Sequence, residues 1–468
     1  MKIGAIVMAA GLGTRMNSDL VKVLHPLCGK PLLFYVLDLL LAAKVEKSAI
    51  VVSHQKQKIM EAVKGCYGAH HPFIFVDQKT PRGTGHAVMK GLGAFKNFKE
   101  PIFILSGDVP LLTLKTVRLF YNHHQKEKAQ LTIGSALLDK SVPYGRVIRD
   151  DSGNLVEVVE TIDATPQQRE IEEMNIGLYC VEPEILAREI KKIKPDNKKQ
   201  EYYLTDIIKW VSQKRVFCVQ NKDEILGVNN RFDLYQKEAY VRKAMNKQWM
   251  LNGVTLKDPS TTYIDAEVIL AKDVVLYPQV HLEGKTLIGQ GTVVGVGAII
   301  RNSQIGPHVR VEAYTLIEDS RVDEGAVVGP FARLRPKTHI KKQGKVGSFV
   351  ELKKTTLGEK SKVNHLSYLG DAEIGKEVNV GCGVITCNYD GGLRFQGKAI
   401  TTIGDQSFIG SDVQLVAPVH LQRGAYVASG TTVTRDVPAD SLVIARVKQT
   451  TKKGYMKRLW AKAGKKKR

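Results

Sequence analysis

The sequence feature that most restricts how this 468-residue chain can fold is a repeat of six residues through its second half. Apolar residues recur at this spacing, with occasional steps of five, and a glycine often follows them, as in Ile288-Gly289. Such a period is typical of a parallel β-helix, in which each hexapeptide forms one side of a triangular coil and points its apolar residue inward. A β-sandwich would instead alternate with a period of two and turn about every eight to twelve residues. We therefore predict a left-handed parallel β-helix of hexapeptide repeats, whose inward residues include Ile264, Leu270, Leu276, Leu282, Val294, Ile300, Ile317, Leu334, Leu352, Leu369, Ile374, Ile409, Leu421 and Val433.

The repeat is interrupted between Thr386 and Thr402, where the sequence CNYDGGLRFQGKAIT has no period of six. We expect this segment to leave the coil as a loop. Binding groups concentrate on loops that a rigid scaffold carries, so this loop is a candidate wall of a binding site.

The first half of the chain alternates short apolar runs with longer amphipathic segments, which is typical of a mostly parallel, Rossmann-like α/β sheet covered on both faces. In such a fold, ligands collect at the carboxyl ends of the strands. A helical pattern from Arg231 to Leu251 predicts a connecting helix that Gly253 ends. The expected strands are Ile3–Met8, Ser48–Ser53, Phe73–Asp77, Ile102–Ser106 and Leu131–Leu137, and the expected helices are Pro31–Ala43, Gln55–Val63, Thr84–Leu92 and Thr113–Gln125.

Together these patterns predict four regions: an α/β domain over residues 1–230, a linker helix over 231–252, a β-helix domain over 253–446 and a basic tail over 447–468. The formal net charge of +22 would permit nucleic acid or an anionic membrane as a partner. Basic residues are spread along the chain, with one dense block at 448–468 that holds ten Lys or Arg and no acid. We expect a solvated tail or one that serves anionic small molecules, with RNA or lipid contact as the alternative.

The cysteine pattern and the hydropathy favour a soluble, cytoplasmic protein. The six cysteines form no C-x-x-C pair and no zinc-ligand spacing, which indicates reduced thiols and argues against a zinc site. No apolar run approaches the roughly 18 residues that a membrane-spanning helix requires. Lys2 and the apolar run after it loosely resemble a signal peptide, but Arg15 and a glycine turn follow at once, which favours a buried strand.

The stretch MAAGLGTRM follows the first expected strand and indicates an anion site. Gly11 and Gly13 suit a tight turn that brings backbone N–H groups against a phosphate. The loop lacks the GxxxxGK[ST] spacing of a Walker loop, and Met16 stands where a dinucleotide-binding fingerprint has its third glycine. The sequence therefore supports neither a Walker-type ATPase nor an NAD enzyme.

The segment AAGLGTRM…KVLHPLCGKP resembles the signature of sugar nucleotidyltransferases, and the hexapeptide half resembles an acyltransferase. In order along the chain, GTGHA, GDVPL, YGRV, EYYLTDI, GVNNR, GPFARLRP, NHLSYLGDAEIG and TCNYDG are similar to the bacterial family of bifunctional N-acetylglucosamine-1-phosphate uridyltransferases and glucosamine-1-phosphate acetyltransferases. This resemblance covers nearly the whole chain. It implies acetyl transfer from acetyl-CoA to glucosamine-1-phosphate, followed by Mg²⁺-dependent uridyl transfer from UTP that yields UDP-N-acetylglucosamine and pyrophosphate.

Nucleotidyl transfer requires groups that neutralise a triphosphate and align the incoming phosphate. The resemblance implies that Arg15 and Lys22 supply positive charge at the phosphates. It also implies that Asp108 and Asn229 hold Mg²⁺, which prefers oxygen ligands. By the same resemblance, Gln78, Gly83 and Thr84 match the uracil-reading positions, Gly145, Glu160 and Asn175 the sugar-phosphate positions, and Ala9, Ala10, Gly11, Gly13, Thr14, Ser106 and Gly107 further nucleotide contacts.

Acetyl transfer from a thioester to a sugar amine requires a base, an oxyanion donor, and cations for the phosphate groups. His365 in NHLSYLG is the best candidate for the base. Glu351 precedes it by fourteen residues, which would place the two on nearby sides of adjacent coils, where the carboxylate would orient the imidazole. Asn388 would stand at the thioester. The resemblance further implies that Arg335, Lys353, Tyr368 and Asn379 bind the sugar phosphate and that Cys382, Asn388, Tyr389, Ser411, Ser429 and Arg446 bind acetyl-CoA.

The flat faces of a triangular coil bury little area alone, so we expect a homotrimer whose acetyltransferase sites draw residues from more than one subunit.

Two alternative functions remain. One is a nucleotidyltransferase fused to a regulatory β-helix, similar to the ADP-glucose or mannose-1-phosphate enzymes; the other is a protein that binds RNA or membrane through its tail. The sequence departs from the family pattern at several positions. Val21 stands where the family has proline, Ser106 where it has tyrosine, and Cys382 and Ser429 where it has alanine. Arg82 within KTPR is also unusual, and the loop at 392–401 is longer.

Overall fold

The structure, a computed structural model, describes residues 2–392 and 397–464. The chain divides into two compact units, Met1–Val241 and Arg242–Arg468. The division falls inside helix α7 (Arg231–Leu251). In the described part of the chain, no helix is both long enough and apolar enough to cross a membrane.

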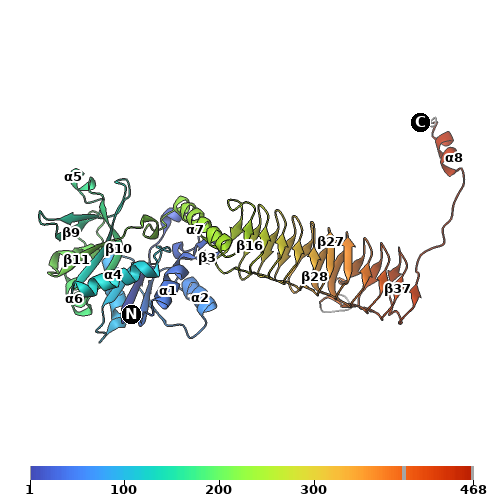
Figure 1. The fold of residues 1–468 in the computed structure, drawn as a ribbon, viewed down its shortest axis with the longest axis horizontal. Helices are drawn as coiled ribbons and strands as arrows, with labels where there is room; N and C mark the ends of the chain where they lie inside the picture. Colours follow the sequence, from blue (N-terminus) through green and yellow to red (C-terminus); the bar gives the residue numbers. More distant parts are fainter. Residues whose placement is uncertain (1, 393–396, 465–468) are drawn as a thin grey trace. The chain divides into compact units, whose positions relative to one another are not determined.

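The first unit is built on a nine-stranded sheet in which parallel pairs predominate (Figure 1). The central strand, β1 (Gly4–Met8), pairs in parallel with β4 (Lys47–Val52) and with β6 (Ile102–Ser106). The main path of the sheet is β11 (Lys214–Cys218), β7 (Leu131–Leu137), β10 (Glu173–Val181), β6, β1, β4 and β5 (Phe73–Asp77), with β10 antiparallel to both of its neighbours and with β8 (Arg146–Arg149) and β9 (Leu155–Val159) added beside it.

Helices cover both faces of this sheet. Alternate residues of β1 enter two separate cores, with Ala5 and Val7 in one and Ile6 in the other. The first core also takes residues from α1 (Leu32–Ala42), α2 (Lys56–Tyr67) and α4 (Leu114–Lys126), and the second takes residues from α3 (Thr84–Leu92) and α6 (Pro183–Glu189). The short β2 (Pro26–Leu27), β3 (Lys30–Pro31) and α5 (Pro166–Arg169) complete the unit. The predicted doubly covered, mostly parallel sheet is confirmed.

The second unit is a left-handed parallel β-helix (Figure 1). Paired residues on successive coils lie 17 or 18 positions apart, as in Ile288 with Ile305 and Leu276 with Val294. One sheet contains β12 (Thr255–Leu256), β15 (Val275–Leu276), β18 (Val293–Val294), β21 (Arg310–Val311), β24 (Val327–Val328), β27 (Lys345–Ser348), β29 (Lys362–His365), β31 (Asn379–Val380), β34 (Phe408–Ile409), β37 (Tyr426–Val427) and β39 (Leu442–Val443). The other two sides of the coil contain β13 (Tyr263–Ile264), β14 (Ile269–Leu270), β16 (His281–Glu283), β17 (Leu287–Ile288), β19 (Ile299–Arg301), β20 (Gln304–Ile305), β22 (Leu316–Glu318), β23 (Arg321–Val322), β25 (Arg333–Leu334), β26 (His339–Ile340), β28 (Glu351–Leu357), β30 (Tyr368–Ile374), β32 (Ile385–Cys387), β33 (Thr401–Ile403), β35 (Gln414–Val416), β36 (Val419–Leu421) and β38 (Thr432–Val433).

The inward residues of the repeat form one continuous core. Every apolar residue that the period of six predicts to point inward is buried, from Ile264 at 3% exposed to Val433 at 2%. The predicted loop is also present. Val380 pairs with Ile409, 29 positions on, whereas Ile409 pairs with Val427, 18 positions on. Residues 393–396 of this loop lie outside the described part of the chain.

One corner of the β-helix carries a row of exposed apolar side chains that the period of six did not predict. Tyr314, Phe331, Phe349 and Leu366 occupy the same corner position on successive coils, each with a positive φ. The rings of Phe331 and Phe349 stack with centroids 5.2 Å apart, and those of Tyr314 and Phe331 with centroids 5.5 Å apart. We refer to these four residues as the apolar ridge.

Beyond the last coil, residues 444–464 are solvent-exposed throughout their described length. They contain a short helix, α8 (Tyr455–Lys462), that the sequence analysis did not predict. The described residues of the basic tail are thus exposed in this chain and include one helix.

We predict that Ile288→Ala destabilises the second unit by about 2–5 kcal/mol, because it leaves a cavity in a core that cannot collapse around it. Its neighbour Leu287 is 43% exposed, whereas Ile288 is 0% exposed. Leu287→Ala is therefore the matched control and should change the free energy of unfolding by about 0.5 kcal/mol. Denaturant unfolding of both variants measures the difference, and equal losses would contradict the inward register of Ile288.

Candidate functional site

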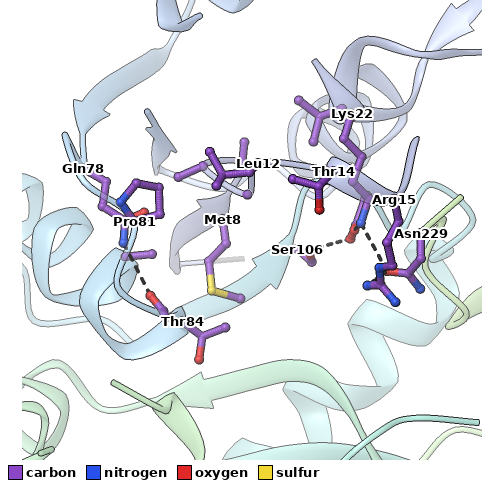
Figure 2. Close-up of a pocket in the computed structure, with 18 of the residues that line it drawn as sticks. Met8, Leu12, Thr14, Arg15, Lys22, Gln78, Pro81, Thr84, Ser106 and Asn229 are labelled. Carbon is purple, nitrogen blue, oxygen red and sulfur yellow. Dashed lines mark hydrogen bonds and ion pairs between the residues drawn. The ribbon is translucent and has the colours of Figure 1, made fainter. Parts of the chain in front are cut away.

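The first unit contains a pocket of about 440 Å³ at the carboxyl ends of β1 and β6. Gln78 and Pro81 lie toward one end of it, and Arg15, Lys22 and Asn229 lie toward the other (Figure 2). The structure brings together in its lining most of the residues that the sequence predicts to bind the nucleotide, namely Ala9, Ala10, Gly11, Gly13, Thr14, Arg15, Lys22, Gln78, Gly83, Thr84, Ser106, Asp108 and Asn229.

A hydrogen bond joins the glycine loop that follows β1 to Ser53, the residue after β4. The Ser53 hydroxyl donates to the Ala10 carbonyl at 2.8 Å. Gly13 has a φ of +64°, and a Cβ at this position would lie 2.6 Å from the Cβ of Lys22. A Cβ on Gly11 would meet no atom within 4 Å. Gly13 therefore lets Lys22 approach the loop, whereas the space beside Gly11 stays open.

At the end of the pocket formed by Arg15, Lys22 and Asn229, two cations contact side-chain oxygens. The Lys22 ammonium forms an ion pair with Asp108 and donates to the Asn229 Oδ1 at 3.3 Å. Arg15 donates to the same Asn229 oxygen at 3.1 Å. The Ser106 hydroxyl donates to Asp108 Oδ1 at 2.5 Å, so the serine that replaces the family's tyrosine holds this carboxylate.

These oxygen groups fit a hard divalent cation. Asp108 and Asn229 come from segments about 120 residues apart, and the hydrogen bond from Val228 N to the Asp108 carbonyl at 3.0 Å brings those segments together. Their side-chain oxygens converge on one positive group, the Lys22 ammonium. Among the residues that the structure describes, no cluster of three or more His, Cys, Asp or Glu is placed to hold a metal. Two protein oxygens completed by phosphate and water are a common way to bind Mg²⁺.

The other end of the pocket is built around a buried amide. Gln78 is 2% exposed, and its Nε2 lies 3.4 Å from the Gly83 carbonyl and 2.9 Å from His86 Nδ1. Gly83 has a φ of +100°, and a Cβ there would lie 2.6 Å from the Tyr202 carbonyl. A glycine is therefore required where this turn passes the 201–204 segment. Arg82, which departs from the family pattern, accepts at its carbonyl from Tyr202 N at 2.8 Å, and its side chain is exposed.

Gly145, Glu160 and Asn175 do not line this pocket but lie together beside β8, β9 and β10. Asn175 N donates to the Gly145 carbonyl at 2.8 Å, and a Cβ on Gly145 would lie 3.5 Å from Glu160 Oε1. Burial raises the pKa of the Glu160 carboxyl. Gly107 donates through its N–H to the Met8 carbonyl at 2.9 Å, which sets the turn before Asp108.

Two of the motifs contain further residues at the site that were not predicted from the sequence. Tyr144 of YGRV accepts at its hydroxyl from Gly227 N at 2.9 Å, and Gly227 lies beside Asp108. Glu201 of EYYLTDI lines the pocket. The motifs themselves were the available signal, but their side-chain directions depend on tertiary contacts. The structure also adds Met8, Leu12, Val23, Pro81 and Ala87 to the lining.

In the second unit, the strand register aligns several predicted residues on one edge. His365, Cys382, Ser411 and Ser429 each lie two positions after a residue of one paired column, Val363, Val380, Ile409 and Val427. We call these four the His365 row. Neighbouring strands lie about 4.8 Å apart, so the row extends along several successive coils. Arg446 joins its end, because its guanidinium donates to the Ser429 carbonyl at 2.7 Å.

A second cluster lies on the next face and is rich in cations. Arg335 and Lys353 follow paired residues on adjacent coils. Lys398, which the sequence analysis did not assign, lies in the loop that leaves the coil. The charges of Lys398 and Arg335 lower the pKa of Lys353. A concentration of like charges of this kind is a suitable site for a phosphate group.

The tips of Tyr368 and Asn388 meet over Gly370, where a Cβ would contact both side chains. Asn388 is 6% exposed and donates from Nδ2 to Asp371 at 2.7 Å. Tyr389, the next residue, is 65% exposed. The start of the loop therefore packs against this face.

Two predicted pairs are not joined by a hydrogen bond within the described part of this chain. Glu351 accepts from Arg335 at 2.8 Å, and no hydrogen bond joins it to His365 among residues 2–392 and 397–464. The reason is the corner at Leu366 and Phe349, which places His365 before the turn and Glu351 after it. The same corner places Asn379 on the 11-stranded face and Tyr368 on the next face.

Comparison with known proteins identifies both halves of the chain. Residues 5–150 match the family of MobA-like NTP transferase domains. Over 461 residues the chain is 42% identical to the bifunctional protein GlmU of Pelobacter propionicus, with 98% of each chain covered. It is 43% identical over 458 residues to that of Geotalea daltonii, with 97% of this chain and 98% of the relative covered. The GlmU of Geobacillus thermodenitrificans is 40% identical over 462 residues, with 98% of each covered.

This chain belongs to the GlmU family. As a GlmU protein it is a bifunctional enzyme, a glucosamine-1-phosphate acetyltransferase and an N-acetylglucosamine-1-phosphate uridyltransferase, and it acts in cell wall precursor synthesis. Its substrates are nucleotide, acetyl-CoA and sugar phosphate. The alternative of a nucleotidyltransferase with a purely regulatory β-helix is therefore excluded.

We predict that Gly13→Ala destabilises the first unit by about 1–2 kcal/mol, the cost of a left-handed conformation for a residue with a Cβ. The new methyl group would also displace Lys22. Gly11→Ala is the matched control and should change stability by about 0.5 kcal/mol, because its Cβ meets open space. Thermal unfolding of both variants checks this, and equal stability would contradict the described loop geometry.

Proposed function

We propose that the pocket of the first unit binds UTP with its base near Gln78 and its phosphates near Arg15 and Lys22. The observation that carries this orientation is the separation of the two groups at opposite ends of one pocket (Figure 2). A buried amide can pair with a base edge, and cations stabilise the pyrophosphate as it leaves. Glu160 and Asn175 would then bind the sugar of the incoming N-acetylglucosamine-1-phosphate.

Asp108 and Asn229 are the proposed Mg²⁺ ligands. Their oxygens would hold the cation, which would supply positive charge against the charge that develops during uridyl transfer. In the ligand-free chain, Lys22 occupies this position as the positive partner of both oxygens. On binding of the nucleotide, Lys22 would exchange its Asp108 and Asn229 contacts for phosphate oxygens, while Ser106 continues to orient the carboxylate.

For acetyl transfer, we propose that His365 takes the proton from the sugar ammonium and that the coenzyme lies along the His365 row toward Arg446. Support comes from the register, which places the small side chains of Cys382, Ser411 and Ser429 in line below His365. Arg446 at the end of the row is suited to a coenzyme phosphate.

The sugar phosphate would bind at the cation cluster of Arg335, Lys353 and Lys398. Glu351 supports this site by holding the Arg335 guanidinium in place. Asn388 and Tyr368 lie close enough to one another to contact the same small ligand. Asn388 would meet the acetyl thioester, and Tyr389 would cover the coenzyme.

Because the two proposed sites lie in different units, the loss of each activity can be tested separately. Asp108→Ala should reduce uridyl transfer at least about 100-fold, because a proposed ligand of the cation that neutralises the triphosphate is lost, and should spare acetyl transfer. His365→Ala should reduce acetyl transfer by a similar factor and spare uridyl transfer. Separate assays, one for pyrophosphate release from UTP and one for thiol release from acetyl-CoA, provide the readout. Loss of both activities in either variant would contradict independent sites.

We also propose that the protein is a homotrimer in which two chains build each acetyltransferase site. The apolar ridge exposes Phe349 and Leu366 to 61% and 62%, which favours burial against another copy. Leu366 directly follows His365, so a copy packed on the ridge would border the His365 row. Tyr368 and Asn379 point outward from faces that diverge at this corner. A sugar that contacts both would therefore need them from different chains.

Subunit mixing tests the shared site. Tyr368→Ala and Asn379→Ala should each lower acetyl transfer when expressed alone. If each site combines Tyr368 of one chain with Asn379 of another, their co-expression should restore part of the activity, because some mixed trimers contain an intact site. Light scattering should return about three times the 51.8 kDa chain mass. A fully active monomer, or absence of any restoration, would contradict the shared site.

A further inference from the structure

Helix α8 (Tyr455–Lys462) has two opposite faces of different character. Tyr455 and Leu459 are four residues apart and align on one side, and Met456 and Trp460 align beside them. These four side chains are 48%, 41%, 51% and 36% exposed, respectively. Lys457, Arg458 and Ala461 lie on the other side, and Lys462 lies at the edge of the apolar face, next to Tyr455. The helix therefore presents an apolar face to solvent within a basic segment.

The segment around the helix restricts what can cover that face. Residues 448–468 contain ten Lys or Arg and no acid, and four of these cations, at 465–468, lie outside the described residues. A second copy of this segment would carry the same excess of cations and would repel it. An RNA would neutralise the cations but would leave Met456 and Leu459 in water. A partner that takes both faces must combine negative charge with an apolar interior.

An anionic lipid surface has this combination. Amphipathic helices with Trp and Leu on one face and Lys or Arg on the other lie in the interface plane, with the apolar face at the acyl boundary. Trp and Tyr also prefer the headgroup level. A helix of eight residues is marginal in water by itself, so burial of its apolar face would stabilise it.

We propose that residues 448–464 form a surface anchor that attaches this enzyme reversibly to anionic membranes. The apolar face formed by Tyr455, Met456, Leu459 and Trp460 inserts at the lipid interface. Lys457, Arg458 and Lys462 contact the negatively charged headgroups. This attachment needs no membrane-spanning segment and does not involve the catalytic pocket.

Vesicle flotation of the full-length protein tests the proposal. The probes are nuclease-treated protein with vesicles of phosphatidylglycerol and phosphatidylcholine in equal parts, and with vesicles of phosphatidylcholine alone. We expect at least about tenfold more protein on the anionic vesicles, since each Lys or Arg near the surface contributes a several-fold gain. Raising the salt from about 0.1 M to about 0.5 M should weaken binding. Equal binding to both vesicles, or absence of binding to the anionic ones, would overturn the proposal.

Two variants with the same charge separate insertion from simple attraction. Leu459→Glu places a carboxylate in the apolar face, and Ala461→Glu places it on the basic face. We expect Leu459→Glu to bind anionic vesicles at least about tenfold more weakly than Ala461→Glu, because burial of a charge opposes insertion. Equal weakening would show that charge alone drives binding, as with a nucleic acid, and would refute the anchor. Uridyl transfer, whose proposed site lies in the first unit, should be unchanged in both variants and reports on folding.

Discussion

The stacking of inward apolar side chains along the axis of the second unit is the interaction on which the acetyltransferase half depends. Each coil places one apolar residue from each side into the core, and the backbone of the next coil pairs in parallel with it. Because Val363, Val380, Ile409 and Val427 are fixed in one column, residues two positions later are fixed in another. His365 and the small side chains of Cys382, Ser411 and Ser429 thus lie in line on successive coils. An insertion or deletion that changed the period of six would therefore move the residues of the His365 row out of line.

In the first unit, the pocket is formed by the edge of a sheet and not by a repeating coil. Its parallel strands end at one edge, where β1 supplies the glycine loop and β6 leads to Asp108. Positive charge collects at one end of the pocket, and a buried amide lies at the other. The two units therefore form their sites in different ways. The first unit uses the edge of a sheet and a set of ion pairs and hydrogen bonds, and the second uses parallel strands that hold side chains in register. This difference is the physical reason to expect that each activity survives loss of the other.

Much of the fold was predictable from the sequence, because its two periods are long and strong. The strands Phe73–Asp77, Ile102–Ser106 and Leu131–Leu137 and the helix Thr84–Leu92 have the predicted ends. The elements β8 to β10, α6 and α8 were not predicted, because short or irregular segments carry little periodicity. Most of the residues that line the pocket of the first unit were also predicted, because they belong to sequence motifs. The contacts inside the sites were not: Glu351 holds Arg335 rather than His365, and Lys398 approaches Lys353 from a loop with no repeat. Both depend on corners and loops whose directions are set by tertiary packing.

The most direct test of the central claim uses a thiol that the chain already carries in the His365 row. Cys382 is partly exposed, and Cys66, on α2 of the other unit, is an exposed internal reference. The rate of alkylation of both thiols by iodoacetamide can be followed by mass spectrometry with and without acetyl-CoA. If the coenzyme lies along the row, acetyl-CoA at about ten times its dissociation constant should slow alkylation of Cys382 about tenfold and leave Cys66 unchanged. Unchanged alkylation of Cys382 at saturating acetyl-CoA would contradict the account.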